Sequence, residues 1–355
     1  MTEIYAVIMA GGRGERFWPL STGTLPKPFI PLLGKSSLIQ DTAERIRPIV
    51  PIQRTLVSIG TAHLETARKQ LPQIPAENFI VEPVGRDTAA CLGYSALHIE
   101  KRNPEALMLA LPADHYIHDR HSFQSTVQSG VHSLGNATGV VFGITPVRPE
   151  TGYGYILTEK SAAPAGFLPV VRFIEKPDME TAKQYLADGN YFWNSGMFLW
   201  KNRTLLGLFE KHMPELYGGL HRLRSCVHSD SPTSDTAEIF SRLPRISIDF
   251  GILEKTSGLR LIPSDFGWDD IGTWASLERI VPPDAEGNVC MGPHTALDSN
   301  GCILYAKTGS VAVFGVSDLI VVEANGNVLV CPKGKAPDLK TLVKALSRTS
   351  QEPGQ

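Results

Sequence analysis

The sequence lacks most features that mark secreted, membrane-spanning or nucleic-acid-binding chains. Its five cysteines are odd in number, scattered and without a C-x-x-C pair, which excludes a disulfide framework or a cysteine-based zinc site. No apolar run approaches the roughly 18 residues of a membrane span, and the apolar residues 4–10 follow no basic flank, unlike a signal peptide. With 34 Lys and Arg against 36 Asp and Glu, the net charge of −2 offers no bulk attraction to nucleic acid or to anionic membranes.

We therefore expect a cytoplasmic protein with neither nucleic-acid nor membrane partners. Its 355 residues are 42% hydrophobic and 20% charged, which excludes a largely disordered chain. At about 150 residues per domain, this length corresponds to roughly two domains. Because the overall charge is close to zero, any phosphate ligand must be bound by local groups.

Short apolar segments alternate with amphipathic ones through the first two thirds of the chain. This alternation predicts a parallel sheet with helices packed on both faces, which is an α/β fold. The expected strands are 4–9, 55–59, 79–81, 107–111 and 140–144, and the expected helices are 37–46, 63–71, 88–101 and 123–134.

The pattern changes after about residue 280, where residues 282–288 are rich in turn formers. Short apolar segments separated by turn sequences then predict a small all-β region, closed by a helix at 337–346. We expect one domain at 1–280 and a C-terminal β domain at 281–355. The expected β segments are 302–306, 310–314, 319–322 and 328–331.

A glycine-rich loop with nearby basic residues follows the first expected strand. Its small residues are Ala10, Gly11, Gly12 and Gly14. Glycines let the backbone come close to a ligand, and successive amides in such a turn form a concave anion site. Arg16 and Lys27, the latter between two prolines, add positive charge. A triphosphate is the expected partner, and the alternative is a structural turn with surface arginines.

The spacing of this loop does not fit two other phosphate-binding loops. The dinucleotide fingerprint G-x-G-x-x-G requires a third glycine where Phe17 stands. No G-x-x-x-x-G-K-[ST] string of the Walker type occurs. An NAD-binding oxidoreductase is therefore disfavoured.

Two aspartates in distant segments are candidates for a magnesium site. Asp114 follows the strand expected at 107–111, and ligands of open α/β sheets bind beyond the carboxyl ends of the strands. Mg²⁺ usually takes one or two carboxylates and fills its shell with water and phosphate oxygens, so Asp270 is a suitable second ligand. Its neighbour Asp269 should point to the opposite face of an extended backbone. As an alternative, Asp114 or Asp270 caps a helix.

A further acid and lysine, Glu175 and Lys176, follow an apolar stretch. Glu175 is suited to hydrogen-bond a sugar hydroxyl and Lys176 to meet a phosphate, although the two also fit a surface salt bridge. Segments 151–155 and 193–198 place glycine and polar groups where a hydroxylated ligand could approach, or else form a turn or bulge.

Together these segments closely resemble the sugar-nucleotide pyrophosphorylases, specifically the mannose-1-phosphate guanylyltransferases. Each motif alone is weak, but the set recurs in family order from residue 4 to about 280. The matching segments are 17–21, 26–29, 82–89, 111–115, 173–177, 193–198, 247–255 and 267–274.

The resemblance implies a Rossmann-like nucleotidyltransferase domain with a mostly parallel mixed sheet, followed by a β-helix-like C-terminal domain. It also implies Mg²⁺ as the cofactor, with Asp114 and Asp270 as its ligands. Arg16 and Lys27 are implied to contact the departing pyrophosphate.

The resemblance further assigns the sugar and the nucleotide. Glu175 and Lys176 are implied to contact the sugar and its phosphate, helped by Gly154 and Asn194. The nucleotide is assigned to the loop that begins at Ala10 and to the base-facing positions Glu82, Gly85 and Asp87. Members of the family usually have Asn where Asp87 stands and Pro where Ala90 stands.

The implied reaction transfers GMP from GTP to α-D-mannose 1-phosphate and gives GDP-mannose and pyrophosphate. The sugar phosphate is already anionic and attacks the α-phosphorus in line, so no general base is required. Mg²⁺, Arg16, Lys27 and Lys176 offset the repulsion between two polyanions. The length leaves no room for the phosphomannose isomerase domain of longer members, so one activity is implied.

Two other functions remain open. UTP or dTTP with glucose 1-phosphate would keep the same fold and chemistry. A catalytically silent nucleotide-sensing paralogue would usually have lost one of the charged site residues, and all are present. The C-terminal β domain either covers the catalytic domain or joins two subunits in a homodimer.

Overall fold

The fold was obtained as a computed structural model that describes residues 2–12, 15–159, 166–229 and 235–349. The chain forms two compact units. The first comprises Met1–Gly11, Ile39–Ala113 and Ile117–Trp268, and the second comprises Gly12–Leu38, Asp114–Tyr116 and Asp269–Gln355. Each unit is thus assembled from segments that are far apart in the sequence.

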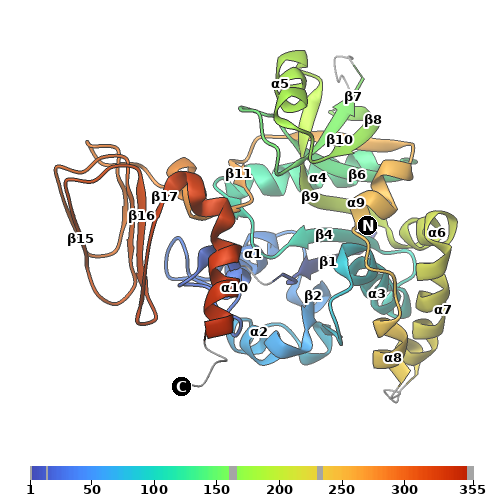
Figure 1. The fold of residues 1–355 in the computed structure, drawn as a ribbon. Helices are drawn as coiled ribbons and strands as arrows, with labels where there is room; N and C mark the ends of the chain where they lie inside the picture. Colours follow the sequence, from blue (N-terminus) through green and yellow to red (C-terminus); the bar gives the residue numbers. More distant parts are fainter. Residues whose placement is uncertain (1, 13–14, 160–165, 230–234, 350–355) are drawn as a thin grey trace. The chain divides into compact units, whose positions relative to one another are not determined.

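The first unit is built around a nine-stranded mixed sheet (Figure 1). Its strand order is β3-β2-β1-β4-β9-β6-β10-β8-β7, with β7 also paired to β9. The strands are β1 (Ile4–Met9), β2 (Thr55–Gly60), β3 (Phe79–Glu82), β4 (Leu107–Pro112), β6 (Gly139–Ile144), β7 (Gly154–Thr158), β8 (Leu168–Glu175), β9 (Tyr191–Lys201) and β10 (Leu259–Ser264).

Four neighbouring strands of this sheet, β3, β2, β1 and β4, are parallel. Their continuous apolar sequences fit strands that are covered on both faces. The carboxyl ends of β1 and β4 are in register, with Met9 opposite Pro112. The chain passes from the first unit into Gly12 and Asp114 just after these two strand ends.

The other part of the sheet is largely antiparallel. The long strand β9 runs antiparallel to β4, β6 and β7, and its pairing with β6 shifts between Val141 and Gly143. Strand β7 pairs with β8 so that Gly154 lies opposite Glu175. Two residues far apart in the sequence thereby become neighbours.

Helices cover the faces of the sheet. Helix α3 packs against α6 and α7, and α7 packs against α8, in one helical layer, while α4 packs on β6 and β10 (Figure 1). Asp119 and Asp178 cap α4 and α5 by accepting backbone N–H groups. The helices are α1 (Leu38–Ile46), α2 (Leu64–Gln70), α3 (Asp87–Arg102), α4 (Arg120–Leu134), α5 (Met179–Asp188), α6 (Asn202–His212), α7 (Pro214–His228), α8 (Asp235–Ser241) and α9 (Ile248–Gly251).

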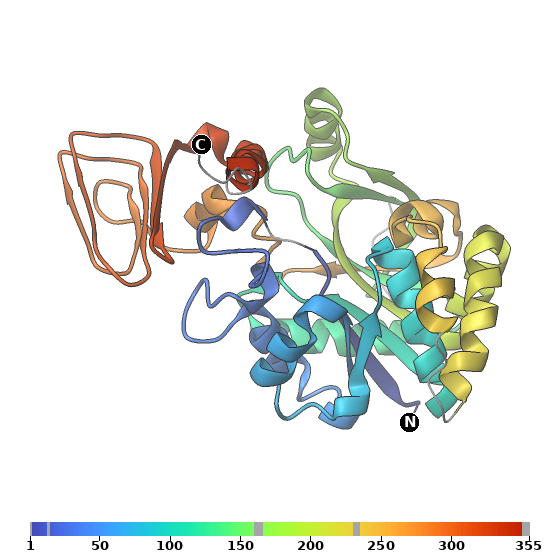
Figure 2. The ribbon, with the colours of Figure 1, turned by 60° about the horizontal axis from the view of Figure 1, so that its bottom comes forward.

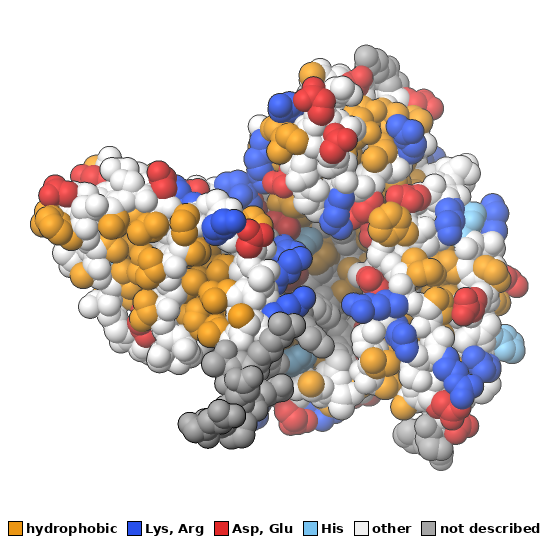
Figure 3. Space-filling view, in the orientation of Figure 1, with side chains coloured by type: hydrophobic (Ala, Val, Ile, Leu, Met, Phe, Trp, Pro, Cys, Tyr) orange, Lys and Arg blue, Asp and Glu red, His pale blue; other side chains and the backbone are white. Residues whose placement is uncertain are grey.

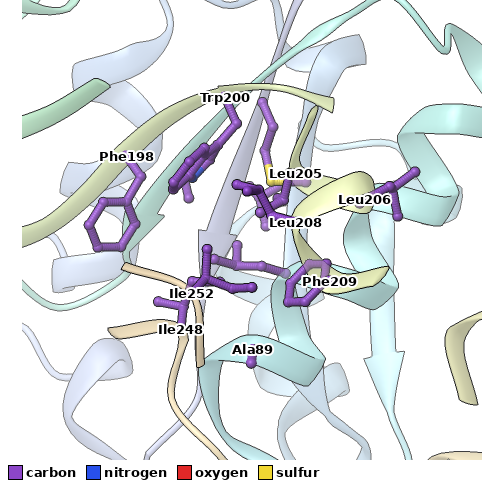
Figure 4. Close-up of a cluster of buried hydrophobic side chains, with 14 of the residues drawn as sticks. Ala89, Phe198, Trp200, Leu205, Leu206, Leu208, Phe209, Ile248 and Ile252 are labelled. Carbon is purple, nitrogen blue, oxygen red and sulfur yellow. The ribbon is translucent and has the colours of Figure 1, made fainter. Parts of the chain in front are cut away.

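A large hydrophobic cluster fills the space between the sheet and this helical layer. Figure 4 shows Phe198 and Trp200 of β9 with Phe209 of α6 and with Ile248 and Ile252 from the α9 region. All five side chains are almost fully buried. The short helix α9 is therefore anchored in the main core.

The second unit contains a small β-solenoid whose stacked coils are seen in Figure 2. One sheet has the order β12-β14-β16-β17, and β13 pairs with β15. The strands are β12 (Val289–Met291), β13 (His294–Leu297), β14 (Ile303–Ala306), β15 (Val311–Phe314), β16 (Leu319–Ala324) and β17 (Asn327–Pro332), followed by α10 (Leu339–Thr349). The short strands β5 (Tyr116–Ile117) and β11 (Trp268–Asp269) form a two-stranded sheet.

The core of the second unit combines the solenoid with the segment that follows β1. Phe17, Leu20 and Ile30 lie in one buried cluster with Ile303 and Ile320 of the solenoid. The ring of Trp274 packs in a tilted arrangement against both Phe17 and Tyr305, with 5.2 Å between ring centroids in each pair. The C-terminal strands thus help to hold the loop that follows β1.

The solenoid also carries apolar side chains on its outer surface. Figure 3 shows hydrophobic side chains gathered over it. Leu297, Phe314, Val328 and Val330 on β13, β15 and β17 are each more than half exposed.

The predicted fold class is confirmed in both parts, the nucleotidyltransferase-type mixed sheet and the C-terminal β domain. The predicted boundary at 280 stays a prediction, and the structure groups residues 269–280 with the solenoid and with residues 12–38. Among the described residues, no helix combines the length and the apolar character needed to cross a membrane.

Candidate active site

Lys27 is the centre of a charged cluster in the second unit. It lies in a 3₁₀ turn (Lys27–Phe29) that Pro26 precedes, and its side chain is only 9% exposed. Its Nζ is 3.0 Å from Oδ2 of Asp114 and donates to the backbone oxygen of Asp270 at 2.5 Å. The structure therefore brings three of the predicted residues together, from three separate parts of the sequence.

Asp114 is held in its ionised form by this cluster. Burial raises the pKa of its carboxyl, but the charges of Lys27 and His115 outweigh burial and lower the pKa below its usual value. A carboxylate that stays charged beside a fixed ammonium is suited to bind a further cation together with an anionic ligand.

Asp270 lies in a tight turn that is fixed by its neighbour. Asp269 accepts the N–H of Ile271 at 2.8 Å and binds Arg279 through both carboxylate oxygens, at 2.6 and 2.8 Å. Ile271 has a φ of 44°, which is strained for a β-branched residue. The two adjacent aspartates have different surroundings: Asp269 has these structural partners, whereas the carboxylate of Asp270 lies where a side chain at Gly272 would begin.

Arg16 contacts the same turn from the loop after β1. Its guanidinium donates to the backbone oxygen of Gly272 at 3.3 Å, and the residue is exposed. Both predicted phosphate-binding cations are therefore tied to carbonyl oxygens of one turn. Ala10 is buried at the end of β1, Gly11 is exposed and Gly12 has a φ of 104°, whereas Gly14 lies outside the described residues.

Asp114 and Asp270 fit the donor set that a magnesium ion requires. Asp114 presents a carboxylate oxygen to the ammonium group of Lys27, and Asp270 contacts the same ammonium through its backbone oxygen, so each residue offers a hard oxygen donor near this cluster. Two carboxylates are enough for Mg²⁺ when phosphate oxygens complete its shell. No cluster of three or more His, Cys, Asp or Glu side chains suited to a metal occurs in the described part of the chain.

The predicted sugar-binding residues come together in the first unit. Glu175 ends β8, and its Oε1 is 2.5 Å from Nζ of Lys176, which has a φ of 47°. The other oxygen of Glu175 lies against the Cα of Gly154, where a Cβ would clash with it. Asn194 of β9 also borders Gly154. An acid and an amide thus border Gly154, and the lysine lies beside the acid.

One residue of this cluster was not predicted as a site residue. Asp249 of α9 accepts a hydrogen bond from Nδ2 of Asn194 at 2.7 Å. Burial, and then the negative charge of Glu175, raise the pKa of Asp249 to about 6. The segment 247–255 was among the family-like motifs, but a single aspartate in a short helix gives no signal that its carboxylate meets Asn194, 55 residues away.

The predicted base-binding segment lies at the end of β3 and the start of α3. Glu82 accepts a hydrogen bond from Ser58 at 2.7 Å, and burial raises the pKa of Glu82. Gly85 is exposed, with open space where a Cβ would lie. Asp87 has a φ of 66° and accepts the N–H of Thr88. Asp and Asn tolerate this left-handed conformation best among residues with side chains. Asp87 can therefore adopt the same backbone conformation as the Asn that the family usually has at this position.

Comparison with known proteins identifies the family to which these clusters belong. A family model described as Nucleotidyl transferase matches residues 5–286, and one described as MannoseP isomerase/GMP-like beta-helix domain matches residues 292–346. The first match covers most of the chain. The chain belongs to the nucleotidyl transferase family.

Relatives of this nucleotidyl transferase match it over nearly its whole length. The mannose-1-phosphate guanylyltransferase of Escherichia coli (strain K12) is 37% identical over 353 residues, which are 97% of this chain and 74% of that protein. The alginate biosynthesis protein AlgA of Pseudomonas aeruginosa is 35% identical over 344 residues, which are 96% of this chain and 71% of that protein. The predicted resemblance to sugar-nucleotide pyrophosphorylases is thereby confirmed.

A solved structure has the same architecture. A crystal structure from Thermus thermophilus, described as a mannose-1-phosphate geranyltransferase, has a TM-score of 0.89 at 37% identity. The match covers 97% of this chain and 99% of that chain. The roles of the individual site residues remain predictions, which the described contacts now make specific.

Proposed function

We propose that this nucleotidyl transferase transfers GMP from GTP to α-D-mannose 1-phosphate and releases pyrophosphate. The observation that carries the proposal is the charged cluster in which Lys27 joins Asp114 and the turn at Asp270. Buried, fixed cations and acidic metal ligands are what phosphoryl-group transfer requires, because its barrier is lowered by positioning and charge. The relatives' names supply the choice of mannose 1-phosphate and of GTP.

The phosphate oxygen of the sugar attacks the α-phosphorus of GTP in line, the new P–O bond forms, and the bond to pyrophosphate breaks. The attacking oxygen is already anionic, so no residue has to remove a proton. Lys27 and Arg16 bind the departing pyrophosphate and neutralise the charge that accumulates on it. Lys27 is suited to this role because the carbonyl of Asp270 and the carboxylate of Asp114 hold its ammonium in place.

Asp114 and Asp270 would hold Mg²⁺. When bound, the ion would neutralise part of the negative charge of the phosphates. The lowered pKa of Asp114 keeps its carboxylate available as a ligand at neutral pH. Asp269 and Arg279 maintain the turn that presents Asp270.

In the first unit, Glu175, Asn194 and Lys176 would bind the hexose phosphate. Glu175 and Asn194 border Gly154, where hydroxyl groups can reach both a carboxylate and an amide. Lys176 is 60% exposed, so its ammonium is free to turn from Glu175 toward a phosphate.

The preference for guanine would come from Glu82. Guanine presents two adjacent donors, N1–H and the 2-amino group, which match the two oxygens of one carboxylate. Uracil and thymine present a single ring N–H flanked by carbonyl oxygens, which a carboxylate would repel. Ser58 holds one oxygen of Glu82 and thereby orients the group.

The test is pyrophosphate release from a matrix of nucleoside triphosphates and hexose 1-phosphates, with and without Mg²⁺. We expect the highest kcat/KM for GTP with mannose 1-phosphate, and loss of turnover when the metal is chelated. A higher kcat/KM for UTP or dTTP with glucose 1-phosphate would replace the proposed substrates but keep the chemistry. Absence of release with every pair, alongside nucleotide binding, would instead identify a non-catalytic sensor.

A further inference from the structure

The short helix α9 connects the predicted base segment with the predicted sugar site. Thr88, at the start of α3, accepts the N–H of Ile248 at 2.8 Å. The backbone N–H of Ala89 donates to the oxygen of Ile246 at 3.3 Å. The residues that precede and begin α9 are therefore bound directly to the segment that begins at Glu82.

Helix α9 is held rigidly enough to place a side chain. Ile248 and Ile252 lie in the main core with Ala89 and Phe209 (Figure 4). Ser247 caps the helix by accepting the N–H of Phe250. The core side chains point one way, while the intervening Asp249 meets Asn194.

The hydrogen bonds of Asn194 fix the orientation of its amide. Asp249 can only accept when ionised, so it faces Nδ2, at 2.7 Å. The N–H of Gly196 can only donate, so it faces Oδ1, at 3.0 Å. One N–H of the amide and a lone pair of Oδ1 are left for a ligand. Removal of Asp249 would allow the amide to rotate.

We propose that Asp249 is a positioning residue for the hexose 1-phosphate, which it serves by orienting the Asn194 amide beside Glu175 and Gly154. This inference rests on the proposed function. It adds a residue and a specific task to the site, because the charged residues predicted from the sequence are all assigned to direct contact with a ligand.

The surroundings of Asp249 support this role. Its carboxylate lies near that of Glu175, and Glu175 and the oriented amide of Asn194 both border Gly154. A ring of hydroxyl groups offers several donors at fixed angles, and two carboxylates accept such donors well. Keeping two acids so close is electrostatically unfavourable, which is typical of a binding site rather than of a structural contact.

The experiment measures steady-state KM values for GTP and for the hexose 1-phosphate in Asp249→Ala, Asp249→Asn and Asn194→Ala. We expect Asp249→Ala to raise the KM for the sugar phosphate about tenfold, the typical value of a hydrogen bond to a charged group, and to leave the KM for GTP within about twofold. Asp249→Asn keeps an acceptor oxygen for Asn194, so it should retain most of the affinity. Glu210→Gln, an exposed acid on α6, is the matched control.

The KM of the double variant Asp249→Ala/Asn194→Ala for the sugar phosphate should be no higher than that of the more damaged single variant, because both changes remove the same function. Additive losses, equal changes in both KM values or an unchanged KM for the sugar phosphate would overturn the inference. A purely structural role would instead lower stability without separating the two KM values.

If Asp249→Ala does not fold, a reciprocal exchange provides the test. Asn194→Asp alone places two carboxylates together and should raise the KM for the sugar phosphate. Adding Asp249→Asn restores the hydrogen bond with donor and acceptor exchanged, so we expect it to recover the free energy of unfolding but not the affinity, because a carboxylate at position 194 has no N–H to donate to the sugar phosphate. Recovery of the full affinity would contradict the inference. An inactive wild type would reject the proposed function itself, whereas an active wild type with unaltered Asp249 variants would reject only this inference.

Discussion

At the scale of single residues, Lys27 is the group on which the proposed chemistry depends most. Its ammonium has two fixed partners, Asp114 and the carbonyl of Asp270, so its position is set before substrate binds. Preorganised charge of this kind lowers the barrier because little reorganisation is needed during the reaction.

We therefore predict that Lys27→Ala lowers kcat by about 10² to 10³, by analogy with the loss of one preorganised donor. The KM for the hexose 1-phosphate should change little, because Lys27 is assigned to the pyrophosphate side. Steady-state kinetics measures both values, circular dichroism checks folding, and Lys69→Ala on the surface of α2 is the control. An altered KM for the sugar phosphate with unchanged kcat would show that Lys27 serves the other substrate.

Glu82 should determine which nucleotide base the enzyme prefers. Glu82→Gln replaces one acceptor oxygen by a donor, which suits the carbonyl oxygens of uracil and thymine better than the donors of guanine. We predict that kcat/KM for GTP falls at least about tenfold, as for loss of a hydrogen bond to a charged group, while kcat/KM for UTP or dTTP stays equal or rises. Competition between the triphosphates measures this ratio. An unchanged preference for GTP would place base recognition elsewhere.

At the scale of elements, the short and continuously apolar strands were the easiest to predict. The prediction 4–9 coincides with β1, and those for β2, β3, β4 and β6 differ by one residue at an end. These strands are buried on both faces, so their sequences are uniformly apolar. Helices α1 to α4 were also predicted, with ends shifted by up to three residues.

The antiparallel half was harder to predict for physical reasons. Strand β9 contains Asn194, Ser195 and Gly196, whose polar and small character indicates a turn or bulge. Tertiary pairing with β4, β6 and β7 overrides that local preference. The same pairing brings Asn194 to Asp249, a contact that no sequence spacing encodes. The candidate phosphate-binding residues could be selected from the sequence because charge and glycine content mark them locally.

Helix α3 carries a buried histidine that should make stability depend on pH. Burial, and then the charges of Arg102, Lys101 and His228, lower the pKa of His98 to about 4, and its buried Nε2 has no hydrogen-bond partner among the described residues. Between this value and the ordinary pKa near 6.5, the unfolded chain binds more protons than the folded one. The free energy of unfolding therefore rises with pH through this window.

We predict that His98 raises the free energy of unfolding by up to about 3 kcal/mol between pH 4 and pH 6.5. This increase should be complete above pH 6.5. Urea denaturation at several pH values measures the slope. His98→Phe should flatten it, whereas a change at the exposed His221 of α7 should not. An equal slope in wild type and His98→Phe would show that other groups titrate in this window.

At the scale of the whole molecule, the C-terminal solenoid and the loop after β1 form one folding core. Phe17, Leu20 and Ile30 pack with Ile320 in the second unit, and Asn325 donates to the backbone oxygen of Pro19 at 2.9 Å. The solenoid is therefore part of the support for the segment that carries Arg16 and Lys27. Homodimer formation and a cytoplasmic location stay predictions.

Ile320→Ala tests this dependence because Ile320 is fully buried in β16. We predict a loss of about 2 to 4 kcal/mol in unfolding free energy, the usual cost of such a cavity. Residues 12–38 should also become more susceptible to proteolysis, and kcat should fall. Val330→Ala on the exposed face of β17 is the control. Destabilisation without altered proteolysis of residues 12–38 would contradict a shared core.

The proposed direct transfer, without a covalent intermediate on the protein, is tested most directly by exchange of labelled pyrophosphate into GTP. With Mg²⁺ and GTP but no mannose 1-phosphate or GDP-mannose, we predict no exchange, because pyrophosphate leaves only when the sugar phosphate attacks. With GDP-mannose present, labelled pyrophosphate should give labelled GTP and an equal amount of mannose 1-phosphate. Exchange when mannose 1-phosphate and GDP-mannose are both absent would require a nucleotidylated protein residue and would contradict the proposed mechanism.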